Sequence, residues 1–133
     1  MDNNSTIQLE LLQKTPMCYS LSMLEEMNDN NYLLEMLNAY LNLLPKQLNE
    51  MKEKAAAKDF RNLSMAAHTV KGSLGLLQAQ VLVSALTTIE QQAKKEIVEL
   101  DLIEFTCTRY MELAVHLEKE QQRVELLVRE TNS

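Results

Sequence analysis

Hydrophobic residues recur every three or four positions along most of this chain. The clearest stripe lies within residues 32–58 and consists of Leu33, Met36, Leu37, Tyr40, Leu41, Leu44, Leu48 and Met51. This spacing is typical of an amphipathic α-helix. Pro45 lies inside the stripe, and because the stripe continues in phase beyond it, we expect the proline to kink the helix without ending it.

Three further helices follow from the same period. Asp59 is the predicted N-cap of the first, whose inward face consists of Phe60, Leu63, Ala67, Val70, Leu74 and Leu77. After a turn at Gln78-Ala79, a helix over about 80–96 directs Leu82, Ala85, Leu86, Ile89 and Ala93 inward. The pattern Asp101-x-x-Glu104 predicts a capping box that opens a long last helix. Its inward residues are Ile103, Tyr110, Leu113, Leu117, Val124 and Val128.

The first thirty residues are less regular. An apolar patch (Ile7, Leu9, Leu11 and Leu12), closed by Pro16, suits either a docked helical turn or a loose tail. Residues 20–27 predict a short helix with Ser20 as its N-cap and Met23, Leu24 and Met27 at helical spacing, which would cover one end of the domain. The chain is therefore predicted to be all-α, an antiparallel four-helix bundle with a short additional N-terminal helix. We assign residues 1–19 to an N-terminal extension and 20–130 to the bundle.

Composition agrees with a helical chain and narrows its possible partners. Among 133 residues there are two glycines and two prolines, too few for the turns of an all-β fold. The net charge of −6 argues against nucleic acid or an anionic membrane as a partner. Cys18 and Cys107 form no metal-binding or disulfide pattern and are expected to be reduced thiols. With no secretory signal and no membrane span in the pattern, we expect a soluble, cytoplasmic protein. We also expect it to be a monomer.

One helical face carries an unusual group of residues. His68 lies off the core stripe of its helix, and Lys71, Gly72 and Gly75 follow at positions i+3, i+4 and i+7 on the same side. Each glycine inside a helix costs about 1 kcal/mol relative to alanine. Close helix packing would explain the glycines, and Gly75 could instead help to end the helix. The functional explanation is access, because a missing side chain lets a bulky partner approach the imidazole.

Charge and exposed apolar groups distinguish the same region. No Asp or Glu occurs in residues 60–89, which carry only Arg61 and Lys71, so this window has a charge of +2 and the rest of the chain −8. Met65 and Leu76 lie on the outer side of the helix, where they either form a docking surface or pack under the N-terminal segment. The other histidine, His116, has no Glu-x-x-His partner, and the sequence predicts no metal site.

The segment Ala67-His68-Thr69-Val70-Lys71-Gly72-Ser73 resembles the signature of histidine-containing phosphotransfer (HPt) domains, which are four-helix bundles of multistep two-component phosphorelays. The resemblance extends over about residues 18–128. One departure lies at the end of the same helix, where family members often have Gly-Ala and this chain has Gln78-Ala79. Met1 and the polar end Thr131-Asn132-Ser133 favour a free-standing protein over a piece of a hybrid kinase.

The resemblance implies roles for particular residues. His68 would be the phosphoacceptor, Lys71 would contact the phosphoryl group, and Gly72 would let the partner approach. Glu90 would hydrogen-bond the imidazole from the next helix. Supporting roles would fall to Ser73 and Gly75, and the partner surface would include Arg61, Met65 and Leu76.

The expected function is that of a relay intermediate. His68 would receive a phosphoryl group from a receiver-domain aspartate and pass it to a second receiver. The partners would be response-regulator receivers and a hybrid sensor histidine kinase. The chain has no glycine-rich nucleotide loop, so it should have no kinase activity and no cofactor of its own, and Mg²⁺ should come with the receiver. The alternative is a non-catalytic helical adaptor that binds receiver or kinase domains.

Overall fold

The computed structural model describes the backbone of residues 3–132 and the side chains of residues 9–131. Six helices follow one another along the chain: α1 (Asn3–Lys14), α2 (Ser22–Glu25), α3 (Asn30–Ala56), α4 (Phe60–Leu76), α5 (Gln80–Lys94) and α6 (Leu100–Asn132). No strand occurs among the described residues. Ile7, which belongs to the predicted N-terminal patch, lies outside the described side chains.

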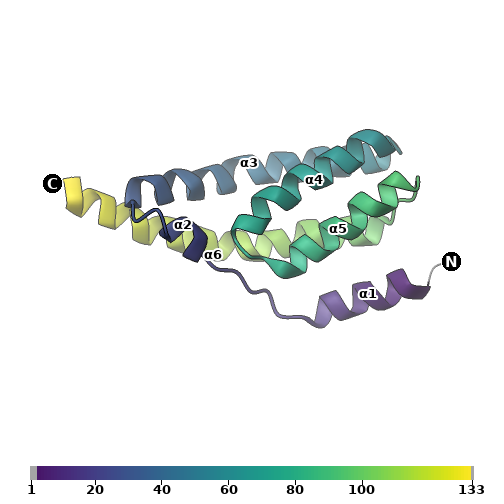
Figure 1. Cartoon of the computed structure of the whole chain (residues 1–133), viewed down its shortest axis with the longest axis horizontal. Helices are drawn as coiled ribbons and strands as arrows, with labels where there is room; N and C mark the ends of the chain where they lie inside the picture. The colour runs from purple at the N-terminus through teal and green to yellow at the C-terminus, as the bar shows by residue number, and fades with distance from the viewer. Residues whose placement is uncertain (1–2, 133) are drawn as a thin grey trace.

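The four long helices α3 to α6 form the predicted antiparallel bundle (Figure 1). Each of them packs against two of the others, and the α4–α5 and α3–α6 contacts are the most extensive. Leu, Ala, Val and Met fill the centre, joined by the fully buried Tyr110. The Tyr110 hydroxyl donates a hydrogen bond to the backbone oxygen of Tyr40 at 2.6 Å, so its polar atom is satisfied inside the core.

Helix α3 passes through Pro45 without ending, as the in-phase stripe predicts. Its buried residues are Leu33, Leu37, Tyr40, Leu44, Leu48, Met51 and Ala55. A proline inside a helix removes one backbone hydrogen bond and crowds the carbonyl of the preceding turn. Burial of the stripe on both sides of Pro45 offsets that cost, so packing, more than local propensity, maintains the helix.

The N-terminal residues form a full helix that is docked on the bundle. Helix α1 contacts α5 (Figure 1), and Leu12 is buried within the common core. The Arg109 guanidinium of α6 donates hydrogen bonds to the backbone oxygens of Gln13 and Thr15 at 3.5 and 3.0 Å. Of the two readings of this segment, the docked one is therefore correct, and its helix is longer than the single turn predicted.

Some local predictions are wrong in detail. Helix α6 begins at Leu100, so Asp101 lies in the first turn and is not the N-cap. In α2 only Leu24 is buried, whereas Met23 and Met27 are 44% and 62% exposed. Phe60 is only partly buried at the start of α4. In the last two cases the helical period is correct, but the burial of a residue near the end of a helix depends on which neighbour is present there.

Three helices end in the same way, with a residue in the left-handed region. Lys58, Gln78 and Glu96 have φ angles of 55°, 54° and 59°. After α4, the amide of Gln78 donates to the Gly75 oxygen at 3.0 Å and that of Ala79 to the Leu74 oxygen at 3.4 Å, which is the Schellman pattern. The Gln78-Ala79 turn is thus well defined, although glutamine replaces the glycine that this position favours.

No helix in the described part of the chain is long and apolar enough to cross a membrane.

Candidate functional site

His68 extends from the outer side of α4 into solvent. Its neighbours Ala67 and Val70 are fully buried, and they fix the helix so that the imidazole faces away from the core, with 70% of its side chain exposed. The expectation that His68 leaves the core stripe is confirmed. An exposed imidazole is open to a partner as large as a folded domain.

Glu90 of α5 contacts this imidazole on the side of the ring that carries Nδ1. His68 Nδ1 lies 3.0 Å from one Glu90 carboxylate oxygen, Oε2, and 3.3 Å from the other, Oε1. The tight turn at residues 77–79 brings α5 back along α4. His68 and Glu90, which are 22 positions apart in the sequence, therefore lie side by side. Only 9% of the Glu90 side chain is exposed.

Two lysines flank the same carboxylate. Lys71 Nζ donates a hydrogen bond to Glu90 Oε1 at 2.7 Å, and Lys94 Nζ lies 3.8 Å from Oε2. Lys71 comes from α4 and Lys94 from the last turn of α5. Sequence reasoning identified His68, Lys71 and Glu90 but missed Lys94, whose i+4 spacing from Glu90 could have indicated it.

The carboxyl group of Glu90 has a lowered pKa in this setting. Burial raises the pKa of Glu90, but the hydrogen bonds from Lys71 and His68 outweigh it, so the pKa is lowered overall. Glu90 is therefore an acceptor-only carboxylate at neutral pH. An ionised carboxylate can only accept at Nδ1, so this contact favours the tautomer of the neutral imidazole in which Nδ1 carries the proton and Nε2 the free lone pair.

Both glycines lie on the open face of α4. A Cβ atom built at Gly72 or Gly75 meets nothing within 4 Å outside its own helix. Close helix packing therefore does not explain them. Gly75 also lies inside α4, and the left-handed residue after this helix is Gln78, so Gly75 is not the residue that ends it. The absent side chains leave free space one and two turns beyond His68.

Exposed groups on the same side of α4 form a mixed surface. Met65 is 60% exposed and Leu76 is 38% exposed, so neither packs under the N-terminal segment. Arg61 is also exposed, two turns before His68. The Ser73 hydroxyl instead donates to the Thr69 oxygen of its own helix at 3.5 Å, so the structure does not join it to the group around His68.

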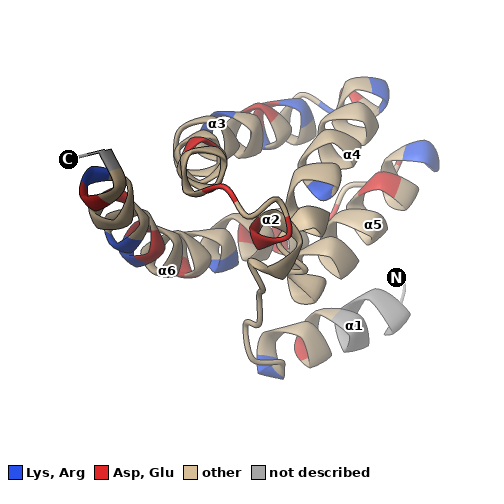
Figure 2. Ribbon diagram, turned by 60° about the vertical axis from the view of Figure 1, so that its left-hand side comes forward, with Lys and Arg blue, Asp and Glu red and all other residues tan. Residues whose placement is uncertain are grey.

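Charge is sparse on α4 and α5. Within residues 60–94, which contain both helices, Glu90 is the single acidic residue and the basic residues are Arg61, Lys71 and Lys94. In Figure 2, acidic residues are frequent on α6 but mark α5 only near its C-terminal end. An anion bound at His68 would therefore meet more positive than negative charge from these two helices.

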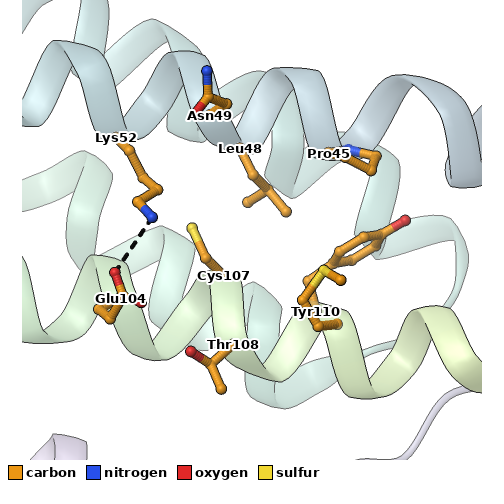
Figure 3. A pocket seen from close by; sticks show the side chains of 9 residues that line it. Pro45, Leu48, Asn49, Lys52, Glu104, Cys107, Thr108 and Tyr110 are labelled. Atoms are coloured by element: carbon orange, nitrogen blue, oxygen red, sulfur yellow. Dashed lines mark ion pairs between the residues drawn. The ribbon is translucent and has the colours of Figure 1, made fainter.

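A hollow lies between α3 and α6, away from His68 and its neighbours. It has a volume of about 260 Å³, and Figure 3 shows Pro45, Cys107 and Tyr110 along it, with the Lys52–Glu104 ion pair of 3.4 Å at one end. Burial raises the pKa of the Cys107 thiol. Cys18 and Cys107 are both free, and no group of three metal-ligating side chains occurs among the described residues.

His116, the other histidine, lies on the surface of α6. Its ring centroid is 5.9 Å from that of Tyr19, in the segment between α1 and α2. This contact suits a structural residue that holds the segment against the bundle.

A comparison with protein-family models gives one match. The Hpt domain model matches residues 35–128, from the second turn of α3 to near the end of α6. The matched stretch includes His68, Lys71, Gly72 and Glu90. A search of curated proteins and a search of solved structures found no match to this chain.

Proposed function

Because this chain belongs to the Hpt domain family, whose members carry phosphoryl groups on histidine in two-component phosphorelays, we propose that His68 is its phosphoacceptor. His68 accepts the group from an aspartate of one receiver domain and passes it to an aspartate of another. The observation that carries this assignment is an exposed imidazole whose Nδ1 is held 3.0 Å from the Glu90 carboxylate.

In this reaction the imidazole supplies the nucleophile. The Nε2 lone pair attacks the phosphorus, the bond from phosphorus to the aspartate oxygen breaks, and the aspartate leaves as a carboxylate. Nδ1 keeps its proton, so the ring gains a positive charge as the P–N bond forms. Glu90 stabilises that charge through its contact with Nδ1. The reverse sequence delivers the group to the next receiver.

Lys71 supplies the positive charge for the phosphoryl oxygens. It lies one helical turn after His68, and its ammonium reaches Glu90 in the free protein. Because its four-carbon stem is flexible, the ammonium can turn from Glu90 towards a phosphoryl group on Nε2. Phosphoryl transfer depends mainly on such alignment and charge stabilisation.

The protein acts as a carrier and not as a kinase. Hpt domains pass on phosphoryl groups that other proteins supply. Both glycines of this chain lie within α4, so no glycine-rich loop is left to hold a nucleotide. We assign the Mg²⁺ ion and the reactive aspartate to the receiver domain. A hybrid sensor histidine kinase is the expected source of the group.

Receivers dock on the outer face of α4 in this proposal. Gly72 and Gly75 leave room for the partner next to His68, while Met65 and Leu76 offer apolar contacts. Arg61 adds a positive charge at the edge of this surface. This surface has a few exposed apolar groups around the reactive atom. Such a simple surface suits several receivers.

Phosphorylation of His68 is tested with a phosphorylated receiver domain. Wild-type protein should acquire phosphate that is stable to alkali and labile to acid, whereas His68→Gln should acquire none. His116→Gln is the matched control, because it removes the other exposed histidine, and it should be labelled like wild type. Labelling of His68→Gln would refute the assignment. Binding of the receiver without labelling of the wild type would favour the adaptor function.

A further inference from the structure

Glu90 has a cation on each of its two carboxylate oxygens. Lys71 Nζ lies 2.7 Å from Oε1, and Lys94 Nζ lies 3.8 Å from Oε2. The Lys94 side chain is 66% exposed, whereas the Lys71 side chain is 26% exposed. In the free protein Lys71 is thus the close partner of Glu90, and Lys94 is a looser one with freedom to move.

Phosphorylation of His68 makes the net charge around Glu90 more negative. The phosphoryl group brings two negative charges and the ring gains one positive charge, so the local net charge falls by one. Lys71 is the ammonium that can turn from Glu90 to the phosphoryl oxygens. When it turns, it leaves Oε1 of a carboxylate that is only 9% exposed, and water replaces the lost partner poorly at such a buried group.

We infer that Lys94 is the second cation of this site, which takes over the neutralisation of Glu90 when Lys71 turns to the phosphoryl group. This inference rests on the proposed function of His68. Lys94 is a positioning residue, because it acts through Glu90 and needs no contact with the phosphoryl group. Its effect belongs to the phosphorylated state, since in the free protein Lys71 already holds the carboxylate.

The charges on α4 and α5 are consistent with this division of roles. Glu90 is the single acidic residue of the two helices, so Lys94 has no other carboxylate to pair with on them. The four-residue spacing keeps Lys94 on the Glu90 side of α5. Lys95 follows immediately and is exposed, and no ion pair of Lys95 is found among the described side chains.

The test measures how phosphate distributes between a receiver domain and this chain at equilibrium. Lys94→Gln should shift the distribution towards the receiver by about two- to five-fold, the effect of one partly exposed ion pair. Lys94→Arg should restore the wild-type distribution. Lys95→Gln removes the same charge one residue away and should leave it unchanged.

A second comparison separates action through Glu90 from direct contact with phosphate. In the Glu90→Gln background there is no carboxylate to neutralise, so adding Lys94→Gln should have no further effect. An equal shift in that background would overturn the inference, as would an unchanged distribution in Lys94→Gln alone. Either result leaves the phosphoacceptor role of His68 standing, because that role is decided separately by the labelling of His68→Gln.

Discussion

At the scale of single residues, the proposed phosphoacceptor role of His68 depends on a partner that is distant in sequence. Nδ1 lies 3.0 Å from Glu90, and Lys71 in turn donates a hydrogen bond to that carboxylate at 2.7 Å. The arrangement differs from a surface histidine such as His116, whose observed ring contact is with Tyr19. Exposure alone therefore does not separate the two histidines, but a buried, ionised partner does.

Gly72 offers a prediction in which stability and activity change in opposite directions. A side chain at this position has free space and replaces a poor helix former, so Gly72→Ala and Gly72→Leu should each raise the free energy of unfolding by about 0.5–1 kcal/mol. Gly72→Leu should slow phosphoryl transfer from a receiver by more than about tenfold, because its side chain occupies the approach to His68.

Denaturant unfolding and the rate of phosphate transfer measure the two effects. Gly72→Ala is the control for helix propensity, and it should slow transfer much less than Gly72→Leu. Transfer at the wild-type rate by a folded Gly72→Leu protein would show that the glycine does not serve access.

At the scale of helices, the ends are formed without glycine. Lys58, Gln78 and Glu96 all adopt the left-handed conformation at a position where glycine is usually preferred. The chain has glycine only at positions 72 and 75, both inside α4. Helix ends here carry a conformational cost that glycine would relieve, while α4 carries the cost of two helical glycines. This distribution fits a role for the glycines in function and not in folding.

Lys58 allows the cost of a left-handed residue to be measured. It is exposed, follows the end of α3 and has a φ angle of 55°. Lys58→Gly should raise the free energy of unfolding by about 0.5–1 kcal/mol, because glycine adopts this conformation without the Cβ clash. Lys58→Ala removes the same long side chain but keeps the Cβ, so it should give no such gain in a denaturant titration. Equal stabilisation by both variants would contradict the backbone explanation.

At the scale of the whole molecule, the bundle has two unlike sides. The α4–α5 side presents His68, few acidic residues and exposed apolar groups on α4. On the opposite side, α3 and α6 form the hollow of Figure 3, where Lys52 and Glu104 pair and Cys107 is partly buried. The proposed receiver surface therefore occupies one side only.

Two methionines of equal exposure test which side docks a receiver. Met65 on α4 is 60% exposed and Met111 on α6 is 61% exposed. Met65→Glu should weaken binding of a receiver domain by about tenfold or more, because a charge is placed in an apolar contact. Met111→Glu should bind as wild type does. Titration calorimetry gives the two affinities, and circular dichroism checks that both variants remain helical. Weaker binding by Met111→Glu alone would place the docking surface on the other side.

The sequence by itself determined the helical fold and the residues that share the His68 face of α4. Hydrophobic periodicity is a local property, so it predicted α3 to α6, the continuation of α3 through Pro45 and the outward direction of His68. Helical spacing likewise placed Lys71, Gly72 and Gly75 on one face. Glu90 was named through the resemblance to HPt domains, because nothing local links residues 68 and 90.

Tertiary structure decided what depends on neighbours distant in the chain. The docking of α1 through Leu12 and Arg109 needs α5 and α6 in place, so its short apolar patch was ambiguous in the sequence. The burial of Leu24 and the exposure of Met23 and Met27 likewise depend on the end of the bundle. Most importantly, the pairing of α4 with α5 brings His68, Lys71 and Lys94 around one buried carboxylate, because only packed helices hold charged groups from separate segments at such distances.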